Sequence, residues 1–171
     1  MDGTIATLFI IAGLTDMGLN HCPTTGCLAE NFATPRLAFQ TSAVEYQTDQ
    51  VAREISLNYA LDRKYGPFQP VVGLSATDDH SAWIGFGVRS DFPVFDTGFV
   101  VEGSLMPGYY AAGDGPELGG NLHFRGALGV SYEFANRMRL GLYYDHRSNA
   151  DTRDENPGLE TYGLRVSIPL R

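Results

Sequence analysis

The sequence is short of lysine, of charge and of long apolar runs. Lys64 is the only lysine, and charged residues make up only 19% of the 171 residues. A surface that faces water normally carries more lysine, so this scarcity indicates that much of the outside does not face water. The formal net charge of −8 argues against a nucleic-acid partner, because such partners bind basic surfaces. Heptads and long helical patterns are missing as well, which argues against a helical bundle.

Cysteine is also scarce. Cys22 and Cys27 are the only two, within the segment CPTTGC. They are compatible with one disulfide in an oxidising compartment or with two free thiols, and the sequence leaves both open. No second pair of cysteines or histidines stands at the spacing of metal ligands, so neither a metal ion nor another cofactor is expected.

The N-terminal segment contains one apolar run, ATLFIIAGL. This run is too short to span a membrane, which takes about 20 residues. It lacks a preceding lysine or arginine, Asp2 stands where a signal peptide carries positive charge, and no clean A-x-A cleavage pattern follows. We therefore treat residues 1–35 as a separate N-terminal segment, either signal-like or packed against the rest of the chain, and residues 36–171 as the folded domain.

The composition of the remaining chain and its regularly spaced turn residues are typical of a β-protein. Glycine is abundant, with 20 residues, and aromatic residues make up 12%. Segments of about ten residues alternate between apolar and polar side chains, and turn-forming pairs such as Gly66-Pro67 separate them. The pattern predicts eight strands, at residues 36–47, 54–64, 68–77, 81–92, 97–110, 121–135, 138–149 and 160–170.

Eight amphipathic strands with short turns predict an all-β fold, an eight-stranded antiparallel up-and-down barrel, because closure removes the exposed strand edges. Periodicity alone does not say which face is inside. A soluble barrel puts its apolar face inward, whereas an outer-membrane barrel has an apolar exterior and a polar interior. Two observations favour the membrane version: the polar faces are mostly small and sparsely charged, and their charges have both signs, as an internal ion network requires. The charges concerned are Glu102, Arg125, Glu133, Arg139, Asp145 and Arg165.

Three residues near the C-terminus combine a base, a hydroxyl and a carboxylate. His146 and Ser148 share the apolar face of strand 138–149, and Glu160 has the parity of the apolar face of the next strand. Antiparallel pairing of these strands would bring all three to one rim of the barrel, on its lipid-facing side. Singly, each has an ordinary explanation as a surface or turn residue. Together they favour a serine hydrolase whose substrate is a lipid ester.

The segments HRSNAD and NPGLE resemble the lipid A 3-O-deacylase family, the PagL-like acyloxyacyl hydrolases, over about 15 residues. This resemblance implies an outer-membrane esterase that hydrolyses the 3-position acyl ester of lipid A in lipopolysaccharide. Ser148 would be the nucleophile, His146 the general base and Glu160 the acid that orients the imidazole. The family also implies membrane lipids as surroundings and a homodimer as a possible assembly.

Four further residues are candidates for supporting roles. Asn149 is the expected oxyanion donor, together with backbone N–H groups of the loop. Asn156 is expected either to shape the loop or to hold the catalytic residues in position without touching the substrate. Arg147 and Arg153 are candidates for contacts with lipid phosphates, with ordinary solvated charge as the alternative.

Two features depart from a standard outer-membrane barrel. The signal sequence is poor, and the chain ends in Ser-Ile-Pro-Leu-Arg rather than in an aromatic residue. Two other functions therefore remain open at this point. One is a structural outer-membrane-type barrel without catalytic activity, and the other is a soluble barrel that binds a small apolar ligand.

Overall fold

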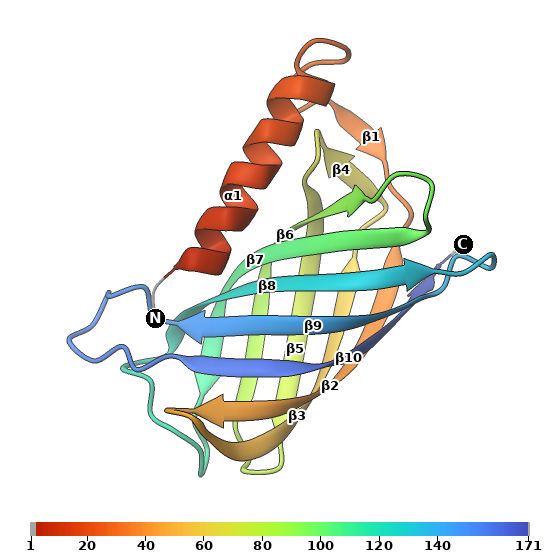
Figure 1. Cartoon of the computed structure of the whole chain (residues 1–171). Coiled ribbons are helices and arrows are strands. Elements are labelled where there is room, and N and C mark those ends of the chain that lie inside the picture. The colour runs from red at the N-terminus through yellow and green to blue at the C-terminus, as the bar shows by residue number, and fades with distance from the viewer. Residues whose placement is uncertain (1–2, 171) are drawn as a thin grey trace.

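The alternating segments form a closed barrel with one helix outside it (Figure 1). The computed structural model describes residues 3–170. The barrel strands are β2 (Arg36–Tyr46), β3 (Asp49–Ala60), β5 (Gln69–Thr77), β6 (Ala82–Pro93), β7 (Phe99–Ala111), β8 (Leu122–Glu133), β9 (Arg139–Ser148) and β10 (Leu159–Pro169). Every neighbouring pair is antiparallel, and β10 pairs with β2 to close the ring. The predicted eight-stranded up-and-down barrel is confirmed.

The strand bounds differ most from the prediction on either side of β3. This strand begins at Asp49 instead of residue 54, because Gln47 and Thr48 form a two-residue turn in which both have positive φ. Neither is the glycine or asparagine that usually marks such a turn. At its other end β3 stops at Ala60, and the chain continues into β4 (Arg63–Tyr65), which pairs with β1 (Glu30–Phe32) as a small separate sheet.

The interior of the barrel is polar and charge-balanced. At the end where β9 finishes, Glu54 accepts hydrogen bonds from Arg125 at 2.6 Å and from Arg147 at 2.7 Å, and Arg125 also pairs with Asp145 at 2.8 Å. Towards the other end, Arg139 bonds to three carboxylates. These are Asp91, Glu102 and Glu133. The predicted network of internal charges is therefore confirmed for Glu102, Arg125, Glu133, Arg139 and Asp145, each of which has a partner of opposite sign. Arg165 differs: its guanidinium donates to the side-chain oxygen of Gln40 at 2.8 Å and lies over the ring of Tyr143.

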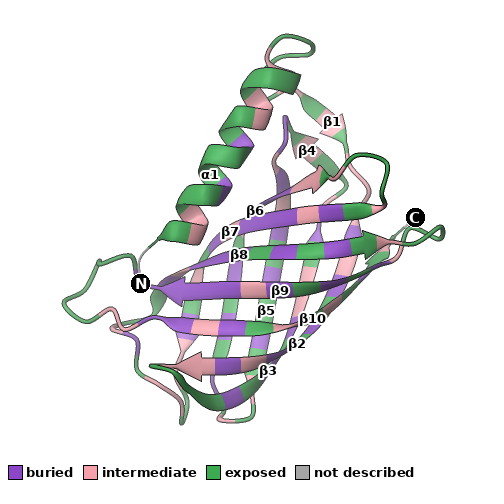
Figure 2. Ribbon diagram, viewed as in Figure 1, coloured by how far each residue is buried: buried purple, intermediate pink, exposed green. Residues whose placement is uncertain are grey.

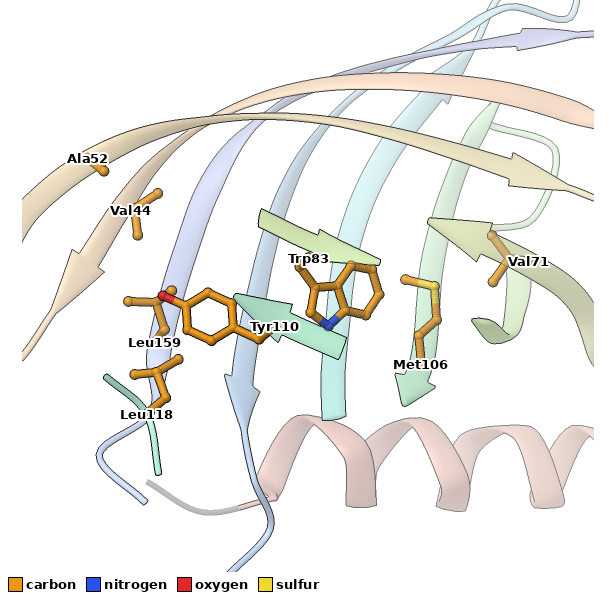
Figure 3. Close-up of a cluster of buried hydrophobic side chains, with 8 residues drawn as sticks. All are labelled: Val44, Ala52, Val71, Trp83, Met106, Tyr110, Leu118 and Leu159. Carbon is orange, nitrogen blue, oxygen red and sulfur yellow. The ribbon is translucent and has the colours of Figure 1, made fainter. Parts of the chain in front are cut away.

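A smaller apolar cluster fills the space beside the charges (Figure 3). Trp83 and Tyr110 are its largest members, and the guanidinium of Arg147 lies 5.7 Å and 5.6 Å from their ring centres. The Trp83 ring fits because Gly85 and Gly108 have no side chains: a Cβ at Gly108 would lie 2.7 Å from it. A narrow lumen filled by side chains is a core and not a channel.

The outer face carries exposed apolar side chains on all eight barrel strands. Figure 2 shows exposed and buried positions alternating along the strands. Ile55 is 70% exposed, Leu142 68% and Ile84 57%, each on a different strand. In water such a continuous apolar surface would be costly, whereas in a bilayer it is the favourable arrangement. The soluble alternative, which requires the apolar face inside, is therefore wrong.

The N-terminal segment forms a helix against the outer wall. Helix α1 (Thr4–Asp16) runs on into the π-helical turn η1 (Met17–His21), and a disulfide joins Cys22 to Cys27 immediately afterwards. The buried face of α1 carries Phe9, which packs edge-on against Phe68 with ring centres 6.2 Å apart. Within residues 3–170, no helix combines the length and the hydrophobicity needed to cross a membrane.

We predict that Glu54→Gln lowers the free energy of unfolding by about 3–5 kcal/mol, because it leaves two buried arginines without their shared carboxylate. Urea unfolding in detergent micelles, followed by the fluorescence of Trp83 as the only tryptophan, measures the change. The exposed loop residue Glu117, with no ion pair to any residue in 3–170, supplies the control Glu117→Gln. Equal midpoints for the two variants would contradict the prediction.

Candidate active site

The end of β9 and the start of β10 bring the base and the acid face to face. In the register of the two strands, Glu160 lies directly opposite His146, and on the other side of β9 Ser148 lies opposite Phe124 of β8. His146 and Ser148 have outward parity, two residues apart, and Glu160 has outward parity on β10. The three side chains therefore belong to the same patch of the outer wall.

One ring nitrogen of His146 is held and the other is free. Nδ1 of His146 lies 3.1 Å from Oε1 of Glu160, in hydrogen-bonding contact. Nε2 is buried and has no hydrogen-bond partner among the described residues, the hydroxyl of Ser148 included. Gly158 packs against the imidazole: it has a φ of 74°, and a Cβ there would lie 2.8 Å from Cε1 of His146. The carboxylate and the glycine together fix the orientation of the ring.

Both residues of β9 are covered although they face outward. His146 is 9% exposed and Ser148 is 8% exposed, whereas the preceding outward residues Leu140 and Leu142 are 45% and 68% exposed. A pocket of about 310 Å³ opens above them, and its walls include Phe124, the loop after β9 and the first turn of α1. The size and the mixture of apolar walls with a few polar groups are typical of small-molecule sites.

Arg147 lies between these two residues but points the opposite way. Its side chain is 1% exposed, inside the barrel, and donates to Glu54 at 2.7 Å. The expected contact with a lipid phosphate is therefore wrong for Arg147, because the residue has inward parity and its guanidinium is enclosed. Its ion pair instead ties the end of β9 to β3.

Asn149 joins two loops. Its amide nitrogen donates to three backbone carbonyls, of Leu118 at 3.1 Å, Gly119 at 3.0 Å and Glu155 at 2.6 Å, and the residue is fully buried. These bonds tie the loop after β7 to the loop after β9. The side chain is thus occupied in holding the loops and is not aimed at Ser148, which differs from the expected oxyanion role.

Asn156 and Arg153 lie in the loop between β9 and β10. The side-chain oxygen of Asn156 accepts a hydrogen bond from the backbone N–H of Asn149 at 3.0 Å, its amide donates to Asp151, and the residue lines the pocket. Arg153 is exposed at the same rim. A contact between Arg153 and a lipid phosphate stays a prediction.

Sequence reasoning missed the contribution of α1. Ile5 and Ala6 line the same pocket as His146 and Ser148, although they come from the opposite end of the chain. One signal was available: Gly103 and Gly126 occupy outward positions of β7 and β8 where other strands carry large apolar residues. An outward glycine on a lipid-facing wall marks a place where another element approaches closely.

We predict that Asn149→Ala loosens the loop between β9 and β10. The substitution leaves three carbonyls without their donor, which costs about 1–3 kcal/mol. Trypsin cleavage after Arg153 should therefore become faster, as followed by mass spectrometry of limited digests. Asp154→Asn changes an exposed side chain in the same loop and serves as the control. Identical digestion of both variants would show that these bonds do not order the loop.

Comparisons with known proteins identify the family of the chain. The profile of the lipid A 3-O-deacylase (PagL) family matches residues 34–169. The lipid A deacylase PagL of Pseudomonas aeruginosa is 38% identical over 53 residues, which make up 31% of this chain and 31% of that protein. The matched segment thus spans about a third of this curated relative.

Solved structures share the fold. The crystal structure of the outer membrane enzyme PagL superposes with a TM-score of 0.64 at 20% identity, over 79% of this chain and 99% of that one. A de novo designed transmembrane β-barrel gives a TM-score of 0.56 at 11% identity, over 82% and 98% of the two chains. The family profile covers most of the chain, including the strands that carry His146, Ser148 and Glu160, and the protein belongs to the lipid A 3-O-deacylase (PagL) family.

Proposed function

We propose that this protein is an outer-membrane esterase that removes the acyl chain at the 3-position of lipid A. The observation that carries the proposal is that His146, in hydrogen-bonding contact with Glu160, lines one pocket together with Ser148. A lipid ester reaches such a pocket without leaving the bilayer. Membership of the deacylase family and the apolar exterior of the barrel both support this substrate and this location.

The reaction assigns one role to each side chain. Oγ of Ser148 attacks the ester carbonyl while Nε2 of His146 takes its proton, and the imidazole then returns that proton to the departing sugar oxygen. Water, activated by the same nitrogen, attacks the acyl-enzyme, releases the fatty acid and restores the serine. Glu160 accepts the hydrogen bond from Nδ1 and stabilises the imidazolium that forms in both steps. Hydrogen bonds between base and nucleophile are often long without substrate and tighten when it binds.

Two backbone N–H groups beside the pocket are our candidates for stabilising the oxyanion. Ala150 and Asp151 follow each other with φ values of 53° and 57°, and both line the pocket. Their N–H groups have no acceptor among residues 3–170. Consecutive N–H groups in such turns form anion-binding concavities, and non-glycine residues in this conformation cost about 1–3 kcal/mol each, which functional sites tolerate. We assign the oxyanion to this turn in place of the Asn149 side chain.

We predict that Ser148→Ala lowers deacylation by at least about 10³-fold, because no nucleophile remains. The measurement is the mass of lipid A before and after incubation with the protein in detergent, in which activity appears as the loss of one 3-hydroxyacyl group. Ser167→Ala removes a hydroxyl from the interior face of β10 and is the matched control. Undiminished release by Ser148→Ala would exclude the triad, and no release by the wild type would favour a barrel without catalytic activity.

We predict a different pattern for Glu160→Gln. The amide keeps the shape but loses the charge that stabilises the imidazolium, so kcat should fall by up to about 10⁴-fold while KM changes little. Initial rates over a range of substrate concentrations separate the two constants. A rise in KM at constant kcat would instead assign Glu160 to substrate binding.

A further inference from the structure

We propose that α1 forms one wall of the acyl-chain site and that Ala6 limits the length of chain that the enzyme accepts. In this arrangement the acyl chain of the ester lies between the first turn of α1 and the outer face of β7 and β8. The inference rests on the proposed function of His146 and Ser148, and the experiments below separate the two.

The pocket itself provides the first argument. It is continuous from the polar groups of His146 and Ser148 to an apolar part formed by Ile5 and Ala6 of α1 and by Leu105 of β7. An ester with its carbonyl at Ser148 places its acyl chain in this apolar part, because no water competes there and the walls are hydrocarbon.

The second argument is the close fit of the helix to the barrel. A Cβ at Gly126 would lie 3.4 Å from the backbone nitrogen of Ala6, and a Cβ at Gly103 would lie 2.6 Å from Cδ2 of Phe9. Both glycines have outward parity, so they form a shallow depression in an otherwise bulky apolar wall. Ala6 and Phe9 of α1 lie against this depression, which fixes the helix above the site.

The third argument is that α1 is apolar on both sides. Leu8, Ile11 and Leu14 on its free side are 54%, 58% and 50% exposed. A helix that is apolar all round is stable where lipid covers its free face. In the proposed arrangement the acyl chain is surrounded by hydrocarbon along its path from the bilayer to Ser148. The first turn of α1 (Figure 1) lines the end of this path next to Ser148.

The match to the deacylase family begins at residue 34, so α1 lies outside it. The matched range contains the barrel and the three candidate catalytic residues, whereas this wall of the pocket comes from a segment outside that range. We infer that chain-length selection by α1 is a property of this chain.

The test is a chain-length profile. Ala6→Leu adds bulk inside the pocket and should lower kcat/KM for nitrophenyl esters of long fatty acids by at least about tenfold relative to those of short ones. Thr7→Leu adds similar bulk one residue on, where the side chain is exposed, and should keep the wild-type profile. An unchanged profile for Ala6→Leu would overturn the inference while hydrolysis that depends on Ser148 stands. Hydrolysis that does not depend on Ser148 would overturn the proposed function instead.

A cross-link tests the position of α1 independently of the substrate. A Cβ built at Gly126 lies 3.7 Å from Cβ of Ile5, within the range of disulfides. The double variant Ile5→Cys/Gly126→Cys should therefore form a disulfide in the membrane-extracted protein, as detected by mass spectrometry, and the cross-linked protein should hydrolyse short esters as fast as each single variant does. The two single variants are the controls.

Three results would overturn the proposal. These are the absence of α1 from the extracted protein, the failure of the cross-link to form, and the loss of hydrolysis of short esters on cross-linking relative to both single variants. The last result would make α1 a lid that has to move instead of a fixed wall.

Discussion

The pairing of opposite charges around Glu54, inside a narrow lumen, is the constraint on which the structure depends. Glu54 is its centre, since two arginines from β8 and β9 share this one carboxylate and Ser75 donates to it as well. An unpaired charge in such an interior would be far more costly than the ion pair is favourable. These ion pairs therefore fix the positions of β3, β8 and β9 relative to one another. Because Arg147 is fixed inward, His146 and Ser148 on either side of it are fixed outward.

The site depends on this anchoring from within. His146 and Ser148 lie on an outer wall whose only core is the lumen of the barrel. Arg147, which stands between them and points inward, ties this part of β9 to Glu54 of β3. The loop beyond β9 is held in turn by the amide of Asn149. Arg147 and Asn149, two of the side chains that we expected to meet the substrate, thus hold in place the strand end and the loop beside His146 and Ser148.

Local patterns in the sequence were sufficient for the barrel and for the parity of the site. Alternation identified the eight strands, and the same alternation placed His146, Ser148 and Glu160 on one face. Contacts between distant segments could not be read in this way. The partner of Arg147 is 93 residues away in sequence, and the acceptors of the Asn149 amide are backbone groups that leave no trace in side-chain types. Packing of residues 1–35 against the rest of the chain was one of two expectations, but its place on β7 and β8 was not predicted, although two outward glycines marked it.

The register of β9 and β10 has a consequence for how the parts of the candidate site come together. His146 and Glu160 are 14 residues apart and meet across a single hairpin, so base and acid come together as soon as that hairpin forms. Helix α1 comes from the other end of the chain, and it can pack in its position only when β7 and β8 lie side by side. The meeting of His146 and Glu160 thus needs one local hairpin, whereas the pocket above His146 needs residues from both ends of the chain.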